Sequence, residues 1–469
     1  MQNSLYLAGK FVTTPHKSKI INPHNGSVIA EISVAGKEEL ETAIRFASTI
    51  RVKMASLTKE ERSLALKQIA DEIKARRKEF AECIALESGK PMRYSLAEAD
   101  RGADTFLIAS GEILHLKTEM LDLERGPSSK GKKGRVEYFP IGVVAGITPF
   151  NFPLNLVAHK VAPAIAAGCP MILKPASSTP LTSLLLAEII DKTNLPKGAL
   201  QVLVCSREIG DSLVSDERIK LLSFTGSPDV GWKMKEKCGK KKMVLELGGN
   251  AGTYIHEDAD LDFAVSRCVM GGFAYSGQIC IHAQRIYVHE KIFTDFESRF
   301  VESVRKIKRG NPLDESTEMA EMIDEKNAKR VEDWINEAEQ KGAKILCGGK
   351  REGSYVEPTV LTQTNTSMKA NAEEVFGPVV ILEKCVSYQE VIRMINDSRF
   401  GLQAGVFTKN QEVAEYAFQH LETGGVILND VPTFRVDNMP YGGIKDSGLG
   451  REGIKYALMD YLEPKLMVF

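Results

Sequence analysis

The sequence predicts an α/β protein of more than one domain, with a parallel sheet covered by helices. From about residue 138, short apolar runs alternate with segments of helical character, and such alternation is typical of a parallel sheet. At 469 residues, the chain also exceeds the length at which one hydrophobic core usually keeps growing. We therefore expect two or more domains, each with its own buried core.

The amino-terminal third is predicted to be rich in helices. Residues 58–61, Thr-Lys-Glu-Glu, have the pattern of a capping box, in which the first and last side chains bond each other's backbone N–H groups. A helical pattern follows and ends at Gly89 and Pro91, residue types that commonly stop helices. The apolar positions of this pattern are Leu64, Ile69, Ile73 and Ile84.

The parallel sheet is predicted from five short apolar runs in the middle of the chain. These runs cover residues 142–147, 171–173, 200–204, 220–223 and 243–245. Because residues 141 and 142 are Ile and Gly, the first strand is expected to begin earlier, around 135–139 and before Pro140.

A second αβ series is predicted after Gly249, where we place a domain boundary. Helices are expected near 261–275 and 291–307, and strands at 285–288 and 379–382. The chain therefore carries two successive α/β units.

The composition resembles that of an ordinary globular protein. Hydrophobic residues make up 43% of the chain and charged residues 26%, with a formal net charge of -1. The amino terminus lacks a basic region followed by an apolar stretch, and the longest apolar segment, 152–171, contains His159, Lys160 and three prolines. We therefore expect a cytoplasmic protein without a nucleic-acid partner or a membrane span.

The cysteines and histidines show no spacing typical of disulfides or of metal sites. The eight cysteines are scattered without a C-x-x-C pair, which favours reduced thiols. No H-E-x-x-H motif is present, so we expect no metal ion. His282, two residues after Cys280, could be imagined as a base or a ligand, but we interpret it as a residue that packs beside a site.

Three segments carry residues suited to covalent catalysis at a carbonyl carbon. Cys280 ends the run Phe-Ala-Tyr-Ser-Gly-Gln-Ile-Cys, Glu246 lies in Leu-Glu-Leu-Gly-Gly-Asn, and Asn151 lies in Thr-Pro-Phe-Asn-Phe-Pro. A thiol is a nucleophile, a carboxylate transfers protons, and an amide donates a hydrogen bond to a developing oxyanion. Taken alone, a cysteine is more often a core residue and an acid is more often solvated; their three contexts favour catalysis.

These segments resemble those of the aldehyde dehydrogenase superfamily, and the match extends over essentially the whole chain. The resemblance is greatest to the lactaldehyde, phosphonoacetaldehyde and non-phosphorylating glyceraldehyde-3-phosphate dehydrogenase branches. It implies a Rossmann-type NAD(P)-binding domain at 1–118 and 141–248, and an α/β catalytic domain at 249–448. Residues 119–140 and 455–469 would form a small β oligomerisation arm, as in a homodimer or homotetramer.

The resemblance also implies a mechanism. The Cys280 thiolate would add to an aldehyde, and Asn151 Nδ2 with the Cys280 backbone N–H would stabilise the resulting oxyanion. Loss of a hydride to the nicotinamide would leave a thioester, which water activated by Glu246 would hydrolyse. Relatives that pass the acyl group to coenzyme A generally lack this acid, so Glu246 favours a free carboxylic acid product. Glu452 matches an acid proposed to relay protons.

The implied cofactor is NAD or NADP. Lys174 resembles the family lysine that contacts the adenosine ribose, and Ser177 occupies a position where many NAD-preferring relatives have Glu. A hydroxyl there does not repel a 2′-phosphate, so Ser177 favours NADP weakly. Glycines after a strand let the backbone approach a pyrophosphate at a helix start. The complete set of predicted cofactor residues is Ile147, Thr148, Phe150, Lys174, Ser177, Gly226, Ser227, Gly231, Leu247, Glu374 and Phe376.

The predicted substrate is a small polar or anionic aldehyde. Arg101 and Arg435 fall where relatives that act on anionic short aldehydes carry arginines, and a guanidinium grips such groups through parallel hydrogen bonds. His159 and Arg285 are weaker candidates for the same pocket. The competing interpretation is that each arginine forms an intramolecular ion pair.

Two other functions remain open at this point. A cysteine-dependent esterase or hydrolase would use Cys280, Glu246 and Asn151 without redox chemistry, although no histidine is placed by motif as a partner of the thiol. A catalytically silent relative would at most bind the cofactor. The intact catalytic set argues against the second of these.

Overall fold

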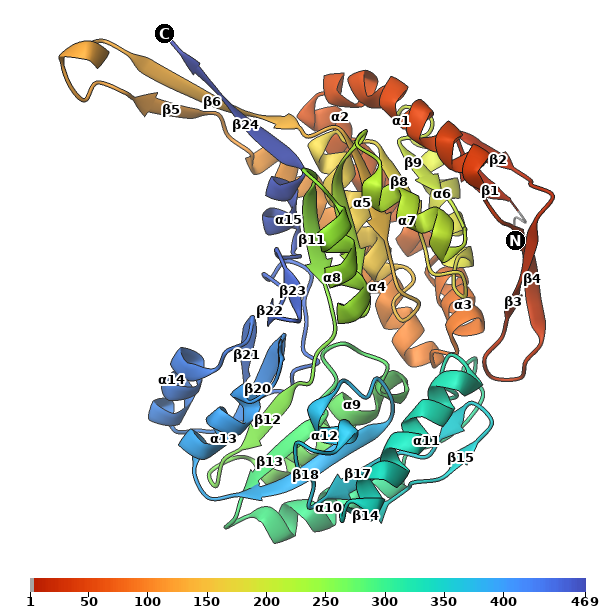
Figure 1. Cartoon of the computed structure of the whole chain (residues 1–469), viewed down its shortest axis with the longest axis vertical. Coiled ribbons are helices and arrows are strands. Elements are labelled where there is room, and N and C mark those ends of the chain that lie inside the picture. Colours follow the sequence, from red (N-terminus) through yellow and green to blue (C-terminus); the bar gives the residue numbers. More distant parts are fainter. Residues whose placement is uncertain (1–3) are drawn as a thin grey trace.

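The computed structural model describes residues 4–469 and has two α/β units with a long hairpin that projects from one of them (Figure 1). The first unit is built on an eight-stranded sheet and the second on a seven-stranded sheet. The predicted α/β class is therefore confirmed. None of the helices in this part of the chain is long and apolar enough to cross a membrane.

The eight-stranded sheet has the order β2-β1-β9-β8-β7-β10-β11-β23. Its strands are β1 (Leu5–Leu7), β2 (Lys10–Val12), β7 (Val143–Ile147), β8 (Met171–Lys174), β9 (Leu200–Val202), β10 (Ile219–Thr225), β11 (Lys242–Glu246) and β23 (Gly448–Leu449). The inner strands β9 to β11 are parallel, whereas β1, β2 and β23 pair antiparallel at the edges. All five predicted runs form strands of this sheet.

Helices cover both faces of this sheet. Neighbouring residues of each strand point to opposite faces, so both faces carry apolar side chains that the helices bury. Val144 packs into one apolar cluster, and Val143 and Ala145 pack into the other. The helices of this unit are α1 (Lys37–Ser56), α2 (Lys59–Ala75), α3 (Arg77–Ser88), α4 (Met92–His115), α5 (Asn155–Ala167), α6 (Leu181–Asp191), α7 (Arg207–Ser215) and α8 (Pro228–Lys237).

The predicted capping box begins helix α2. The Thr58 hydroxyl accepts a hydrogen bond from the Glu61 N–H at 3.1 Å, and the Glu61 carboxylate accepts one from the Thr58 N–H at 2.7 Å. The continuous helical pattern is wrong in two details. The helix breaks at Arg76, which separates α2 from α3, and Leu64 is 64% exposed because it lies off the buried face of α2. Gly89 ends α3 with φ 71°, a conformation that favours glycine.

The seven-stranded sheet has the order β14-β17-β18-β13-β12-β20-β21 and is parallel except at β14. Its strands are β12 (Gly252–Ile255), β13 (Arg285–His289), β14 (Lys344–Cys347), β17 (Thr359–Thr362), β18 (Val379–Cys385), β20 (Gln403–Phe407) and β21 (Gly425–Leu428). Its helices are α9 (Leu261–Phe273), α10 (Phe293–Arg305), α11 (Glu325–Gln340), α12 (Lys369–Ala372), α13 (Tyr388–Asn396) and α14 (Gln411–His420). The helices predicted near 261–275 and 291–307 correspond to α9 and α10.

A three-stranded antiparallel sheet forms the projecting hairpin, which we call the arm. It consists of β5 (Glu119–Asp122), β6 (Lys133–Pro140) and β24 (Leu462–Val468), in the order β24-β6-β5. The strand predicted at 135–139 is therefore part of the arm and does not begin the parallel sheet. It pairs with β24 instead, from Leu462 opposite Pro140 to Val468 opposite Gly134.

The predicted arm segment 455–469 includes most of helix α15 (Ile454–Asp460), which does not belong to the arm. Its residues Ile454 and Leu458 join the apolar core of the first unit, so only the part from Leu462 onward lies in the arm. The remaining elements are β3 (Lys17–Ile21), β4 (Val28–Ser33), β15 (Arg351–Glu352), β16 (Tyr355–Val356), β19 (Phe400–Gly401), β22 (Ile444–Lys445), η1 (Pro127–Ser129) and η2 (Ala274–Gly277).

The strand order of the first sheet determines where a site forms. From β7 the chain adds β8 and β9 on one side, and then returns to add β10 and β11 on the other side. The carboxyl ends of β7 and β10 therefore flank a crevice of the kind in which open α/β sheets bind ligands. The second unit begins after β11, and its residues Cys280, Glu374 and Phe376 line the same cavity as Pro149 and Thr225 of the first unit.

Candidate active site

The three predicted catalytic residues line one cavity of about 280 Å³. Asn151 follows β7, Glu246 is the last residue of β11, and Cys280 follows α9 and η2 of the second unit. The cavity lies where the two α/β units meet. Its lining is Pro149, Phe150, Asn151, Leu156, Thr225, Gly226, Ser227, Glu246, Leu247, Gly248, Cys280, Asn327, Arg330, Glu374 and Phe376.

A tight turn before Cys280 places the thiol in this cavity. Tyr275, Ser276 and Gly277 have φ values of 49°, 53° and 67°, so three consecutive residues are left-handed. The Tyr275 hydroxyl donates to the Ser88 carbonyl at 2.9 Å, and the Ser276 hydroxyl donates to the Ala320 carbonyl at 2.6 Å. These buried hydrogen bonds hold the strained turn in place.

The Cys280 thiol is half-buried and lies 2.9 Å from the Tyr441 hydroxyl. Burial, with the negative charges of Glu374 and Glu246, raises its pKa to about 11, while the hydrogen bond with Tyr441 and the positive charge of Arg435 act in the opposite direction. Tyr441 was not predicted from the sequence. Its signal was present in the segment Pro-Tyr-Gly-Gly, but nothing in that segment indicated which residue it would contact.

Asn151 is fixed beside the nucleophile loop. It is 2% exposed, and its Nδ2 donates to the Gln278 carbonyl at 2.9 Å. A side-chain amide has two N–H donors, so one remains for an oxyanion that forms near Cys280. Asn151 is therefore bound to the loop that carries Cys280, the residue beside which it is predicted to stabilise an oxyanion.

Glu246 is buried without a hydrogen-bond partner for either carboxylate oxygen among the described residues. Burial, reinforced by the negative charge of Glu452, raises its pKa well above the usual range of a carboxyl group, although Arg435 and Lys160 partly offset this effect. A base of raised pKa is suited to proton transfer near or above neutral pH.

A buried network of charged residues lies next to Glu246. One of its members, Lys160, was not predicted from the sequence. Lys160 of α5 is fully buried, and its Nζ lies 2.7 Å from Thr225 Oγ1 and 3.4 Å from Glu452 Oε1. Arg435 Nη2 donates to Glu452 Oε2 at 2.8 Å. Burial alone would raise the pKa of Glu452, but Lys160 and Arg435 outweigh it and lower this pKa to about 2. The sequence signal for Lys160 was a lysine next to His159 within a mostly apolar helix.

The predicted anion-binding residues lie next to this network, except for Arg285. Arg101 binds Asp437 through Nη2 at 2.7 Å and Nε at 3.1 Å, and His159 Nε2 lies 2.8 Å from Asp437 Oδ1. Both Arg101 and Arg435 therefore do form intramolecular ion pairs. The Nε of Arg435 and the Nδ1 of His159 are nevertheless buried without a partner among the described residues.

Arg285 points away from this region, and the structure gives no support to its predicted role in substrate binding. Its guanidinium donates to the carbonyl oxygens of Asn250, Met394 and Ile395, at 2.9, 3.0 and 3.1 Å. His282 is also buried and lies 2.8 Å from the Gly272 carbonyl, where burial lowers its pKa to about 4. It packs against α9 and makes no contact with the thiol.

Two glycines allow side chains to pack closely at the carboxyl edge of the first sheet. A Cβ on Gly210 would lie 2.8 Å from the Lys174 side chain, and a Cβ on Gly231 would lie 2.5 Å from Leu247. Both glycines let neighbouring residues approach closely where β8 and β10 end. Thr148, directly after β7, has a buried hydroxyl without a partner among the described residues.

The predicted cofactor residues divide into two groups. Phe150, Gly226, Ser227, Leu247, Glu374 and Phe376 line the cavity together with Cys280. Ile147, Thr148, Lys174, Ser177 and Gly231 lie outside this lining, on or next to the ends of β7, β8 and β10. Glu374 accepts a hydrogen bond from the Gly249 N–H at 3.0 Å, and burial raises its pKa to about 7.

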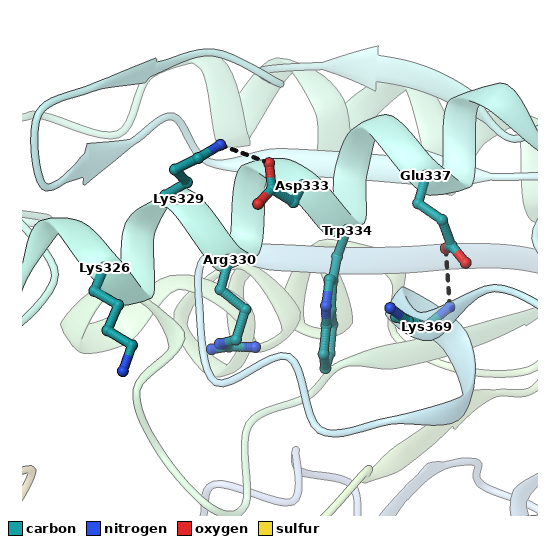
Figure 2. A pocket seen from close by; sticks show the side chains of 7 residues that line it. All are labelled: Lys326, Lys329, Arg330, Asp333, Trp334, Glu337 and Lys369. Atoms are coloured by element: carbon teal, nitrogen blue, oxygen red, sulfur yellow. Dashed lines mark hydrogen bonds and ion pairs between the residues drawn. The ribbon is translucent and has the colours of Figure 1, made fainter.

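A second hollow of about 390 Å³ follows helix α11 on the surface (Figure 2). It shares Arg330 with the cavity at Cys280. The Arg330 guanidinium lies 4.8 Å from the Trp334 ring centroid, and its Nη2 donates to the Val375 carbonyl at 2.7 Å. This contact ties α11 to the segment that carries Glu374 and Phe376. Within residues 4–469, no group of three or more His, Cys, Asp or Glu could hold a metal ion.

Comparison with known proteins places this geometry in a family. The model of the aldehyde dehydrogenase family matches residues 11–467. A 3-sulfolactaldehyde dehydrogenase of Priestia megaterium is 44% identical, over 100% of this chain and 98% of that protein. A lactaldehyde dehydrogenase of Methanococcus aeolicus is 40% identical, over 96% of both chains.

Solved structures agree with these sequence matches. Aldehyde dehydrogenase 21 from Physcomitrella patens, in complex with the reaction product succinate, has a TM-score of 0.98 and 46% identity, with 99% of this chain and 98% of that chain covered. GapN from Methanocaldococcus jannaschii, complexed with NADP, has a TM-score of 0.93 and 36% identity, with 97% and 100% covered. Betaine aldehyde dehydrogenase from Staphylococcus aureus, in complex with NAD+, has a TM-score of 0.96 and 34% identity, with 100% and 97% covered.

Proposed function

The chain belongs to the aldehyde dehydrogenase family, and we propose that its substrate is a small aldehyde with a negatively charged group, oxidised to the free carboxylic acid. The enzyme is an NAD(P)-dependent aldehyde dehydrogenase that acts on small aldehydes through a catalytic cysteine. The observation that carries the substrate proposal is the buried guanidinium of Arg435, whose Nε has no partner among residues 4–469. A buried N–H without an acceptor costs free energy, and an anionic substrate would supply that acceptor.

The position of Arg435 also sets the length of the substrate. Its guanidinium carbon lies 3.7 Å from the ring centroid of Tyr441, and the hydroxyl of the same ring is 2.9 Å from Cys280 Sγ. Only one tyrosine side chain therefore separates the proposed anion site from the nucleophile. This distance suits an aldehyde of a few carbon atoms with the charge at its far end.

The related proteins support a substrate of this kind. The curated relatives are named for 3-sulfolactaldehyde and lactaldehyde, and the moss structure contains succinate as the reaction product. A carboxylate is planar and a sulfonate is tetrahedral, and both present acceptor oxygens that a guanidinium binds. Arg101 binds Asp437 through Nε and Nη2, which leaves Nη1 for a second acceptor.

We propose the following roles for the catalytic residues. The Cys280 sulfur bonds to the aldehyde carbon, and Asn151 Nδ2–H with the Cys280 backbone N–H donates to the oxyanion, where one donor is worth about 10²–10³ in rate. A bound nicotinamide supplies the hydride acceptor. Glu246 takes a proton from the water that attacks the thioester carbon, and the sulfur leaves as thiolate. Glu452, whose negative charge acts on Glu246, would relay that proton.

The cofactor is NAD or NADP, and we propose that Lys174 and Ser177 face its adenosine ribose. The backbone at Gly226 and Ser227, at the start of α8, suits the pyrophosphate. Glu374 and Phe376 would position the nicotinamide ribose and ring. The exposed Ser177 hydroxyl carries no charge that would repel a 2′-phosphate, which supports NADP weakly.

The domain roles and the assembly are also proposals. We assign cofactor binding to the eight-stranded unit and the nucleophile to the seven-stranded unit, with the arm as the oligomerisation surface of a homodimer or homotetramer. The eight cysteines are all free thiols, which suits a cytoplasmic location.

The substrate proposal is tested with pairs of aldehydes that differ only in charge. We expect kcat/KM to be about 10 to 100 times higher for the sulfonated, phosphorylated or carboxylated member of each pair, with either nicotinamide as oxidant, because a charged hydrogen bond is worth about 1.5–3 kcal/mol. Arg435→Met should remove this preference. Arg93→Gln, on the same helix as Arg101 but at its exposed start, is the control and should keep it. Equal kcat/KM for both members of every pair would contradict the proposal.

A further inference from the structure

The Cys280 sulfur has a polar neighbour besides the residues predicted from the sequence, namely the hydroxyl of Tyr441. The oxygen lies 2.9 Å from Sγ. Tyr441 is 3% exposed, and its ring packs with Ile281 and Leu402 in a small apolar cluster that touches Cys280. The sulfur and the phenol oxygen thus lie against the same apolar cluster.

The backbone of Tyr441 is held on both sides by the buried network. Its N–H donates to the Glu452 carbonyl at 3.0 Å, and the Glu452 N–H donates back to the Tyr441 carbonyl at 2.6 Å. The phenol therefore projects toward the sulfur from a fixed base. Moving it would break the bridge that also positions Glu452.

A cation lies on the face of the same ring. The Arg435 guanidinium carbon is 3.7 Å from the ring centroid, and Arg435 is anchored by Glu452 at 2.8 Å. A positive charge over the ring draws electron density from the phenol, which makes its hydroxyl a better hydrogen-bond donor. Burial raises the pKa of Tyr441 well above the ordinary value, so the hydroxyl keeps its proton at all working pH values.

We propose that Tyr441 is a further catalytic residue, whose hydroxyl donates a hydrogen bond to the Cys280 thiolate, stabilises the thiolate when it forms and aims it at the aldehyde. This inference rests on the proposed role of Cys280 as nucleophile. No covalent bond changes at Tyr441, which keeps its own proton throughout. The hydrogen bond weakens once the sulfur is neutral in the thioester, so Tyr441 acts on the attack and not on the hydrolysis.

The test measures the reactivity of the thiol itself, without cofactor or substrate. Iodoacetamide alkylation is followed by peptide mass spectrometry at Cys280 across a range of pH. We expect Tyr441→Phe to slow alkylation about 3- to 15-fold at neutral pH. Loss of a hydrogen bond to the thiolate should raise the pKa of Cys280 by about one to two units, which lowers the thiolate fraction at neutral pH. A thiolate of higher pKa is also more nucleophilic, with a Brønsted slope of about 0.4–0.5, so part of the lost rate is regained.

A second variant series keeps the ring and the hydroxyl, and so does not depend on whether Tyr441→Phe folds. Site-specific replacement of Tyr441 by 3-fluorotyrosine makes the phenol more acidic and a stronger donor. The proposal requires the alkylation rate at neutral pH to follow the order fluorotyrosine, tyrosine, phenylalanine. A residue with only a packing role would show no such order.

Two controls separate this inference from the proposal on which it rests. Tyr254→Phe removes another buried tyrosine hydroxyl, one on β12 whose partner is His256 Nδ1 at 2.7 Å. Its alkylation rate should match that of the unmodified protein. If Tyr441→Phe reacts like the unmodified protein, or no more slowly than Tyr254→Phe, the role of Tyr441 is refuted. If catalysis survives in Cys280→Ser, the nucleophile itself is wrong.

Discussion

At the scale of single residues, the site separates two carboxylates of opposite character. Glu246 and Glu452 lie close enough for their charges to interact, yet only Glu452 has ion-pair partners. The paired carboxylate stays charged, and the unpaired one favours its proton. Glu246 must therefore lose this proton before it can act as a base.

This pair predicts a specific pH dependence. Hydrolysis of the thioester should speed up with rising pH until Glu246 is deprotonated, because only the carboxylate accepts a proton from water. Glu246→Gln should reduce steady-state turnover by about 10²–10⁴ and remove this pH dependence. Stopped-flow absorbance should still record one rapid burst of reduced nicotinamide per subunit. A variant without a burst, or with normal steady-state turnover, would contradict the assignment of Glu246 to hydrolysis.

The same shift has a consequence for stability. Since the pKa of Glu246 is higher in the folded than in the unfolded chain, the folded state binds the proton more tightly, and this stabilisation is lost as pH rises through the folded pKa. Glutamine cannot ionise and should escape that loss. The melting temperature of Glu246→Gln should thus exceed that of the unmodified protein by a margin that grows with pH above the ordinary carboxyl range.

At the scale of elements, the turn of η2 connects the nucleophile to the cofactor segment. Gly277 has φ 67°, and a Cβ there would lie 2.1 Å from the Gly377 carbonyl oxygen. The Glu374 to Gly377 segment thus lies so close to the turn that a side chain at Gly277 would not fit between them. Glycine is required at this position both by conformation and by space.

Gly277→Ala tests this contact. We expect a loss of unfolding free energy of about 2–5 kcal/mol, from left-handed strain and from the clash, together with a higher KM for the nicotinamide. The control is Gly26→Ala, whose φ of 71° is similar but whose Cβ would meet nothing within 4 Å. Chemical denaturation of both variants isolates the clash, because both carry the same backbone strain. Equal losses would mean that the Gly377 contact adds nothing.

At the scale of the whole molecule, the arm exposes apolar side chains that the chain itself does not cover. Met120 is 60% exposed, Leu466 51% and Val468 51%. A three-stranded sheet with one open face gains little stability alone, and such a patch marks an interaction surface. This is the physical support for the proposed assembly through the arm.

Leu466→Asp should dissociate that assembly. A buried, unpaired carboxylate at an interface carries a large desolvation cost, so light scattering should record a smaller particle than for the unmodified protein. Leu64→Asp is the control, because Leu64 is similarly exposed but lies on α2, away from the arm. If Leu466→Asp and the unmodified protein have the same mass in solution, the arm is not the oligomerisation surface.

The strands and their order of appearance were predictable from local pattern. Runs such as 171–173 and 243–245 are apolar on both faces because helices cover both sides of a parallel sheet, and this signal needs no knowledge of contacts. Errors arose where local pattern is ambiguous. The strand at 135–139 has the same period in the arm as it would have in the main sheet, and only its pairing with β24 decides between them.

The catalytic chemistry was predictable from the sequence, because a thiol, an acid and an amide each lie in a distinctive local segment, and so was the succession of α/β units. Which groups modify that chemistry became evident only in the folded structure. Lys160, Tyr441 and Asp437 each contact a partner far away in the chain, namely Glu452, Cys280 and His159, and act only through charges and hydrogen bonds across the folded interior. Such contacts have no local period or spacing, because they depend on burial, and burial exists only once the two units have packed together.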